Sequence, residues 1–155
     1  MMLIICDESP VKSAAYLIKH TNKNFCFKSL LELSQLICSC EISSVYKAVK
    51  QGYLLKEWVR KYPSWVYPFF SYLFQWAKGH VRLKEKTVED MERIEKDLYK
   101  YSVRKKLLPE TAIFRYVKEY EEFTEYPTNA ELPIDVAVKE YEKYVEFKKD
   151  KWDKE

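Results

Sequence analysis

One stretch of the sequence decides the fold class: Phe25-Cys-Phe-Lys-Ser-Leu-Leu-Glu-Leu-Ser-Gln-Leu-Ile-Cys-Ser-Cys40. Its apolar residues cover most of the circumference of a helix, which is typical of a helix that is largely buried. Lys28 and Glu32 are the only charged residues in it. The stretch therefore predicts a helix in the interior of the protein.

The segments on either side of this stretch also show helical spacing and helix-end signals. Ser9-Pro10 is a helix start, because a capping side chain precedes a proline at the first helical position. Thr87-Val-Glu-Asp90 resembles a capping box. With those signals and the apolar periodicity, the sequence predicts helices over 10–20, 25–40, 43–52, 54–61, 64–78, 87–101, 109–123 and 134–152, with loops at 21–24 and 126–133.

The chain has 155 residues, which suits one domain with a real core, and only two glycines. So little glycine argues against tightly turned β architectures. We expect an all-α fold, a compact single-domain helical bundle covering residues 1–155. The opening residues 3–6 are the one place where a short strand is expected.

Several features bear on compartment and ligands. No apolar run reaches the roughly 18 residues of a membrane span, and no basic leader precedes the first apolar residues. We expect an intracellular protein without a membrane partner, whose four cysteines are free thiols. The Cys38-Ser-Cys40 spacing does not fit common zinc sites, so neither a metal nor a small-molecule cofactor is expected. The oligomeric state is left open.

Charge is distributed unevenly along the chain. Residues 1–87 hold 13 Lys/Arg and 6 Asp/Glu, a net charge of +7, whereas residues 88–155 hold 14 and 18, a net charge of −4. Such asymmetry suggests one face for a polyanion, and equally fits uneven surface decoration.

A polar stripe crosses the apolar helix. Lys28, Glu32, Gln35 and Ser39 follow one another at steps of four, three and four, which places them on one face. A carboxylate that is partly desolvated and flanked by polar groups is a candidate acid–base catalyst. The alternative is an ordinary Lys–Glu pair on the one solvated face of the helix.

Cations and aromatic rings alternate in the middle of the chain, a composition that can bind phosphates and stack on bases. We assign Phe69, Phe70, Phe74 and Trp76 to the core, and Arg60 has the alternative role of an internal ion-pair partner. The candidate nucleic-acid contacts are His20, Lys28, Gln35, Trp58, Arg60, Lys61, Trp65, His80 and Arg82, with Arg104-Lys-Lys106 as a further cluster. We expect Arg60, Lys61, Arg82 and at least one of Lys28 and His20 to share one side of the molecule.

The order of several short motifs resembles the pyrimidine-dimer DNA glycosylase family. The likeness extends over nearly the whole chain, and each fragment alone has low specificity. The matching residues are Pro10, Ala14-Ala15, His20, Lys28-x-x-x-Glu32-x-x-Gln35, Trp58-Val-Arg60 before an aromatic helix, and Tyr141-x-x-Tyr144, Lys148 and Trp152 near the end.

The resemblance implies an all-helical enzyme that grips duplex DNA and flips a damaged or modified pyrimidine nucleotide out of the helix. An amine attacks the sugar C1′ to form a Schiff base while a carboxylate assists. Glu32 corresponds to the family's catalytic glutamate, and the amine of Met1 corresponds by position. Two alternatives remain: a helical protein that binds nucleic acid without catalysis, and a protein-interaction module that uses the Tyr-rich acidic half.

Overall fold

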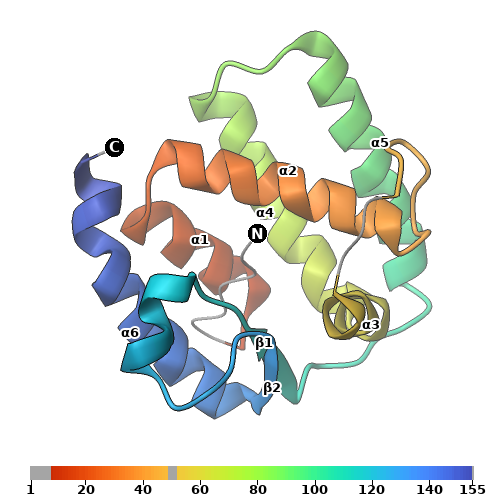
Figure 1. The fold of residues 1–155 in the computed structure, drawn as a ribbon. Coiled ribbons are helices and arrows are strands. Elements are labelled where there is room, and N and C mark those ends of the chain that lie inside the picture. Colours follow the sequence, from red (N-terminus) through yellow and green to blue (C-terminus); the bar gives the residue numbers. More distant parts are fainter. Residues whose placement is uncertain (1–7, 49–51, 155) are drawn as a thin grey trace.

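Six α-helices and one two-stranded hairpin make up the part of the chain that the structure, a computed structural model, describes: residues 8–48 and 52–154. Figure 1 shows their arrangement. In chain order they are α1 (Pro10–His20), α2 (Lys23–Ser39), α3 (Tyr53–Lys61), α4 (Pro63–His80), α5 (Glu85–Ser102), β1 (Thr111–Phe114), the 3₁₀ helix η1 (Lys118–Phe123), β2 (Ala130–Pro133) and α6 (Ile134–Lys154).

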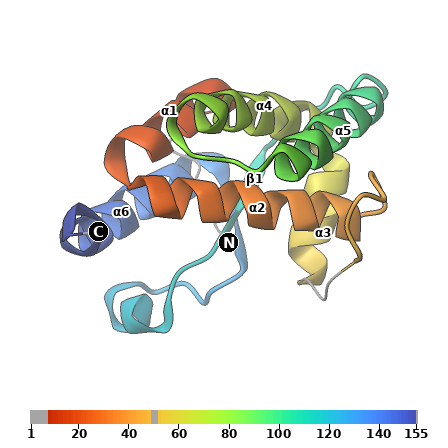
Figure 2. The same ribbon diagram turned by 90° about the horizontal axis from the view of Figure 1, so that it is seen from above.

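The aromatic helix α4 lies at the centre of the core. Trp65, Phe69, Phe70 and Phe74 are each almost completely buried, as the sequence predicts for the three phenylalanines. Helices α1 and α5 pack against α4, and α2 crosses it (Figures 1 and 2). Buried residues from all six helices and both strands form one hydrophobic cluster.

Helix α2 is buried on most of its surface, as its sequence predicts. It begins two residues earlier than expected because the Asn22 side chain accepts a hydrogen bond from the Phe25 amide (2.8 Å) and caps the helix. The capping side chain of Ser9 likewise precedes α1, and Pro10 occupies its first turn.

The second half of the chain departs from the predicted all-α fold. Residues 109–123 do not form a helix: β1 pairs antiparallel with β2, with Ala112 opposite Leu132, and a 3₁₀ helix lies between the strands. Ala112, Ile113 and Phe114 are all buried, because the hairpin packs on α6. The fold is thus mostly helical with a small sheet, and the expected strand at residues 3–6 lies outside the described residues.

Two further predictions fail locally. Residues 43–48 form bends and extended chain rather than a helix. Helix α5 begins at Glu85, so Thr87 lies inside the helix and does not cap it.

Candidate functional site

Three of the four residues of the predicted polar stripe on α2 are exposed or half-buried. The fourth, Ser39, is buried, and its Oγ donates to the Gln35 carbonyl oxygen (2.9 Å). Lys28 is exposed, and Glu32 and Gln35 are half-buried, while the neighbours Leu30, Leu33, Leu36 and Ile37 are buried. The Oε2 atom of Glu32 is shielded from solvent. The stripe therefore presents a partly desolvated carboxylate one helical turn, about 6 Å along the axis, from an exposed cation.

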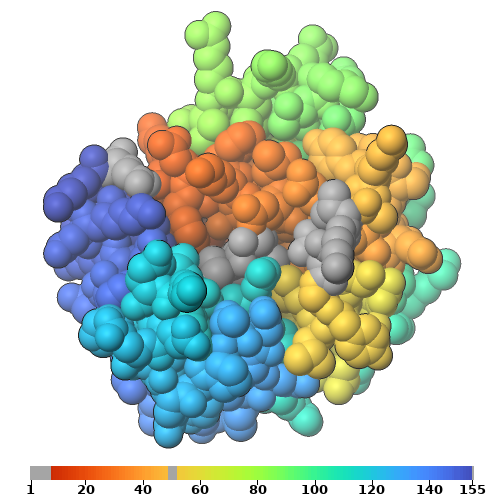
Figure 3. All heavy atoms as spheres, viewed as in Figure 1, coloured from red at the N-terminus to blue at the C-terminus, as the bar shows by residue number. Residues whose placement is uncertain are grey.

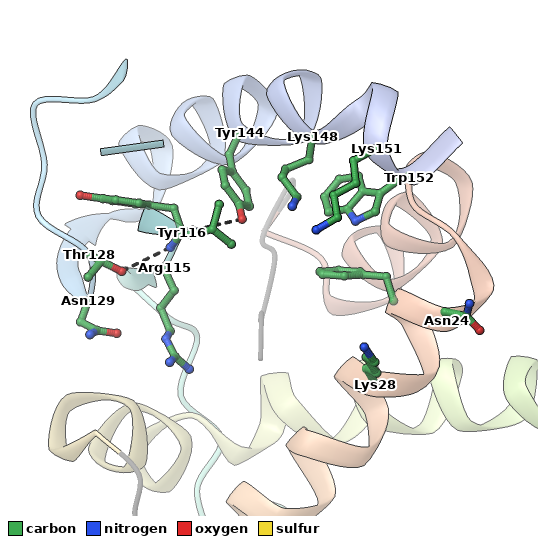
Figure 4. A pocket seen from close by; sticks show the side chains of 12 residues that line it. Asn24, Lys28, Arg115, Tyr116, Thr128, Asn129, Tyr144, Lys148, Lys151 and Trp152 are labelled. Atoms are coloured by element: carbon green, nitrogen blue, oxygen red, sulfur yellow. Dashed lines mark hydrogen bonds between the residues drawn. The ribbon is translucent and has the colours of Figure 1, made fainter. Parts of the chain in front are cut away.

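A basic pocket of about 480 Å³ opens beside the first turns of α2. Lys28, Arg115, Lys148 and Lys151 line it, and the side chains labelled in Figure 4 come from α2, from the chain after β1 and from α6. Among the lining residues that the structure describes there is no carboxylate. Four cations around one hollow create a local field that favours a polyanion.

The face on which this pocket lies is assembled from distant parts of the sequence. Figure 3 shows the start of α2, the segment around η1 and the end of α6 meeting on one side of the molecule. The Asn22 side-chain amide donates to the Trp152 carbonyl oxygen (3.2 Å), which joins the start of α2 to the end of α6. The rings of Phe25 and Trp152 lie 4.8 Å apart and form one wall.

The opposite wall is fixed by hydrogen bonds around the hairpin. The Val117 amide donates to the Tyr144 hydroxyl oxygen (3.3 Å), and the Tyr116 amide donates to Thr128 Oγ1 (3.3 Å). Burial raises the pKa of the Tyr144 hydroxyl, so this group stays neutral. The positive charge of the pocket at neutral pH is therefore not offset by a tyrosinate.

The spacing of residues on α6 explains why its cations reach the pocket together. Tyr144, Lys148 and Lys151 follow at steps of four and three, which puts them on one face of the helix. Lys148 Nζ lies 5.9 Å from the Trp152 ring centroid.

Two of the residues predicted from the sequence lie in the pocket or next to it. Lys28 lines it, and Glu32 is on the next turn of the same helix. His20 does not line it; this residue is exposed at the end of α1, with its ring 4.2 Å from that of Tyr16. Met1, the predicted source of the amine, lies outside the described residues.

The assignment of Trp58 and Trp65 as base-stacking residues is wrong for this conformation. Both are core residues, 3% and 2% exposed. Trp58 Nε1 donates to the Thr111 carbonyl oxygen (2.8 Å), and Trp65 Nε1 donates to the Glu8 carbonyl oxygen (3.0 Å). Their indole groups are satisfied inside the protein.

Arg60 and Lys61 lie on a second pocket, of about 510 Å³, along α3. Arg60 forms an ion pair with Glu57 (2.9 Å), which lies at the surface rather than in the interior as the alternative role supposed. Glu131 also lines this pocket. The Arg60 carbonyl oxygen accepts a hydrogen bond from Lys105 Nζ (3.2 Å). This pocket thus mixes cations with carboxylates and is less basic than the first.

The sequence predicts that Arg60, Lys61, Arg82 and at least one of Lys28 and His20 share one side of the molecule. The structure does not bring them to one pocket, since Lys28 lines the first pocket and Arg60 and Lys61 line the second. Arg60 and Lys61 precede α4, whereas His80 and Arg82 lie at its far end. Because α4 has 18 residues, the two groups are separated by about 27 Å along its axis. The His80 ring stacks on Trp76, and its Nδ1 lies 2.9 Å from the Trp76 carbonyl oxygen.

Three cations of the basic pocket were not among the predicted site residues. The i, i+4, i+7 spacing of Tyr144, Lys148 and Lys151 in the last predicted helix is the signal in the sequence that indicates the two lysines. Arg115 could not be identified from the sequence, since its position in the pocket depends on a hairpin that the sequence does not indicate.

Within the described ranges, no cluster of three or more His, Cys, Asp or Glu side chains is arranged to hold a metal ion. No helix in that part of the chain is both long and apolar enough to cross a membrane. Comparisons with known protein families, with curated proteins and with solved structures found no match for this chain.

Proposed function

We propose that this protein binds duplex DNA through the basic pocket and acts as a DNA glycosylase with AP lyase activity. The observation that carries the proposal is the convergence of four cations on one pocket, one helical turn from the half-buried carboxylate of Glu32. Cations bind the phosphate backbone, and a carboxylate beside them supplies the acid–base group that glycosidic chemistry needs.

In the proposed reaction a neutral amine attacks C1′ of a flipped pyrimidine nucleotide. The C1′–base bond breaks, and the base leaves with its bonding electrons and takes up a proton. Loss of a proton from the attacking nitrogen and opening of the sugar ring then give a Schiff base. Glu32 stabilises the positive charge that develops on the sugar and moves the protons.

The amine is assigned to Met1 by its position in the sequence, and Lys28 is the alternative within the pocket. An α-amine has a pKa near 8 and is partly neutral at neutral pH, whereas an exposed lysine has a pKa near 10.4. The α-amine is therefore the better nucleophile of the two.

The decisive experiment is borohydride trapping on duplexes that carry an abasic site, a pyrimidine dimer or a modified pyrimidine. The wild-type protein should give a covalent adduct with at least one of them, and mass spectrometry of the digested adduct should identify the N-terminal peptide. An adduct on the peptide containing Lys28 would overturn the assignment of the nucleophile.

The role of Glu32 is tested with Glu32→Gln, which keeps the shape of the side chain and removes its charge. We expect loss of adduct, with DNA affinity changed by less than about threefold. Glu92→Gln, at an exposed position on α5, is the matched control and should react as the wild type does. A fully active Glu32→Gln protein would refute the catalytic assignment.

The second candidate is a non-catalytic nucleic-acid-binding protein, which the basic pocket favours independently of Glu32. It predicts salt-sensitive duplex binding without adduct on any of the three substrates. If the protein is a protein-interaction module, we expect neither duplex binding nor an adduct. Absence of duplex binding at low salt would therefore exclude both nucleic-acid functions.

A further inference from the structure

The segment after α5 exposes apolar and basic side chains together. Residues 103–108, Val-Arg-Lys-Lys-Leu-Leu, are all exposed, and we call them the basic patch. Leu107 and Leu108 are 50% and 85% exposed. The segment is anchored, because Ser64 Oγ donates to the Leu107 carbonyl oxygen (3.0 Å) and Lys105 Nζ donates to that of Arg60 (3.2 Å). The two leucines are thus presented from a fixed segment.

A surface of opposite charge surrounds η1. We call it the acidic lobe, and it consists of the exposed residues Glu119, Glu121, Glu122, Phe123, Glu125 and Phe147. The two phenylalanine rings lie 5.2 Å apart, and Phe123 is 58% exposed. In the part of the chain that the structure describes, none of these four carboxylates forms an ion pair.

The two surfaces match in composition and lie on opposite sides of the molecule. Each has exposed apolar side chains beside three or four like charges, and the charges are of opposite sign. Figures 1 and 2 both place η1 on one side and the chain leaving α5 on the other. One molecule therefore cannot bring them together, but neighbouring copies can.

We propose that the basic patch of one copy binds the acidic lobe of the next copy. The exposed leucines pack on the exposed phenylalanines, and the cations at 104–106 pair with the carboxylates at 119–125. A contact of this head-to-tail kind is heterologous and leaves one surface open at each end. It produces a concentration-dependent series of oligomers rather than a single dimer.

A second copy explains more of these features than the other candidate partners. A nucleic acid would bind the three cations but would leave the leucines unused. An anionic membrane would bind the basic patch and repel the acidic lobe, so the exposed Phe123 and Phe147 would stay uncovered. The second copy covers both apolar surfaces in one contact, and the proposal does not rest on the proposed DNA chemistry.

The association is expected to be weak and sensitive to salt. Exposed ion pairs contribute little individually, and small contacts are typical of transient complexes. We expect a Kd of the order of 10–100 µM at low ionic strength. Because exposed charges are screened by salt, the affinity should fall several-fold in 0.5 M NaCl.

The test is sedimentation velocity over a concentration range from about 5 to about 500 µM, with two charge-reversal variants. Arg104→Glu/Lys106→Glu makes both surfaces acidic, and Glu121→Lys/Glu122→Lys removes the net negative charge of the acidic lobe, so that it no longer attracts the basic patch. Each variant alone should remain monomeric, and an equimolar mixture of the two should associate. Lys84→Glu/Lys96→Glu changes charge equally at exposed positions outside both surfaces and should associate as the wild type does.

A Leu108→Ser variant tests the apolar part and should weaken association without changing the thermal midpoint. A wild-type protein that stays monomeric throughout the concentration range would overturn the proposal. A mixture of the two variants that fails to associate would also overturn it. If Arg104→Glu/Lys106→Glu lowers duplex affinity and leaves wild-type-like sedimentation, the basic patch belongs to a nucleic-acid surface and the proposal is wrong.

Discussion

The buried hydroxyl of Tyr141 joins α6 to the hairpin that forms one wall of the basic pocket. It donates to the Ile113 carbonyl oxygen (2.6 Å) and accepts from the Arg115 amide (3.0 Å), at a site where Tyr141 is 1% exposed. Tyr141→Phe leaves both backbone groups without this partner. We expect a loss of about 1–3 kcal/mol in the free energy of unfolding, measured by urea denaturation.

The exposed Tyr99 provides the control, since Tyr99→Phe removes a hydroxyl from a ring that is 52% exposed. Its effect should lie within about 0.5 kcal/mol. Equal effects of the two substitutions would mean that the Tyr141 hydroxyl does not stabilise the hairpin.

Cys40 gives a prediction about pH. Burial raises the pKa of its thiol from 9.0 to about 11, and the unfolded chain has no such burial. The unfolded state therefore loses this proton at lower pH than the folded state does, so the stabilisation is complete below about pH 9 and is lost as pH rises towards 11. Urea midpoints at pH 8 and pH 10.5 should fall more for the wild type than for Cys40→Ser. Parallel decreases would contradict the raised pKa.

Individual residues show which features of the candidate site can be predicted from the sequence and which cannot. The helical spacing correctly placed Lys28 and Glu32 on one stripe of α2, where Lys28 is exposed and Glu32 is half-buried. Residue type alone misplaced Trp58 and Trp65, because an indole ring suits base stacking and core packing equally well. Their hydrogen bonds to backbone carbonyl groups, which decide the matter, are made across more than 50 residues of sequence.

At the scale of elements, the start of α2 is held by one side chain with two roles. Asn22 caps the helix through the Phe25 amide and also donates to the Trp152 carbonyl oxygen on α6. Asn22→Ala should cost about 1–2 kcal/mol, the usual range for a lost cap, and should also loosen the end of α6. Hydrogen exchange should therefore increase in both segments.

Ser9→Ala is the matched control, because Ser9 caps α1 through the Lys12 amide (3.2 Å) at an exposed site. Its effect on hydrogen exchange should be confined to α1. If Asn22→Ala leaves α6 unaffected, the bond to Trp152 does not couple the two helices.

Local signals were enough to predict the helices α1 to α6, including α5, since a cap, a proline or an apolar stripe marks each of them. They were not enough for the hairpin. The residues of β1 are few, and their burial depends on α6, which lies later in the chain. Pro109 therefore suggested a helix start where the tertiary contacts favour a strand.

At the scale of the whole molecule, the basic pocket does not follow the charge asymmetry of the sequence. The half with a net charge of −4 supplies Arg115, Lys148 and Lys151 to the basic pocket, and the half with a net charge of +7 supplies only Lys28. The excess acidic residues of the second half include the carboxylates of the acidic lobe. Folding thus separates charges that are interleaved along the chain.

That separation predicts which cations determine the salt dependence of duplex binding. Each phosphate contact contributes about 0.9 to the slope of log K against log salt, so Lys28→Ala/Lys151→Ala should lower the slope by about two. Arg60→Ala/Lys61→Ala should lower it by less than one, because Arg60 is paired with Glu57 and a second carboxylate lines its pocket.

Lys96→Ala/Lys139→Ala is the control pair for this measurement. Both lysines are exposed, and Lys139 lies on the face of α6 opposite Lys148, since nine residues correspond to two and a half helical turns. Fluorescence anisotropy on one duplex between about 50 and about 200 mM salt gives all four slopes. If the control pair lowers the slope as much as Lys28→Ala/Lys151→Ala does, binding follows net charge rather than the pocket. If Arg60→Ala/Lys61→Ala has the larger effect, the duplex contacts the second pocket along α3 rather than the basic pocket, which contradicts the proposed binding site.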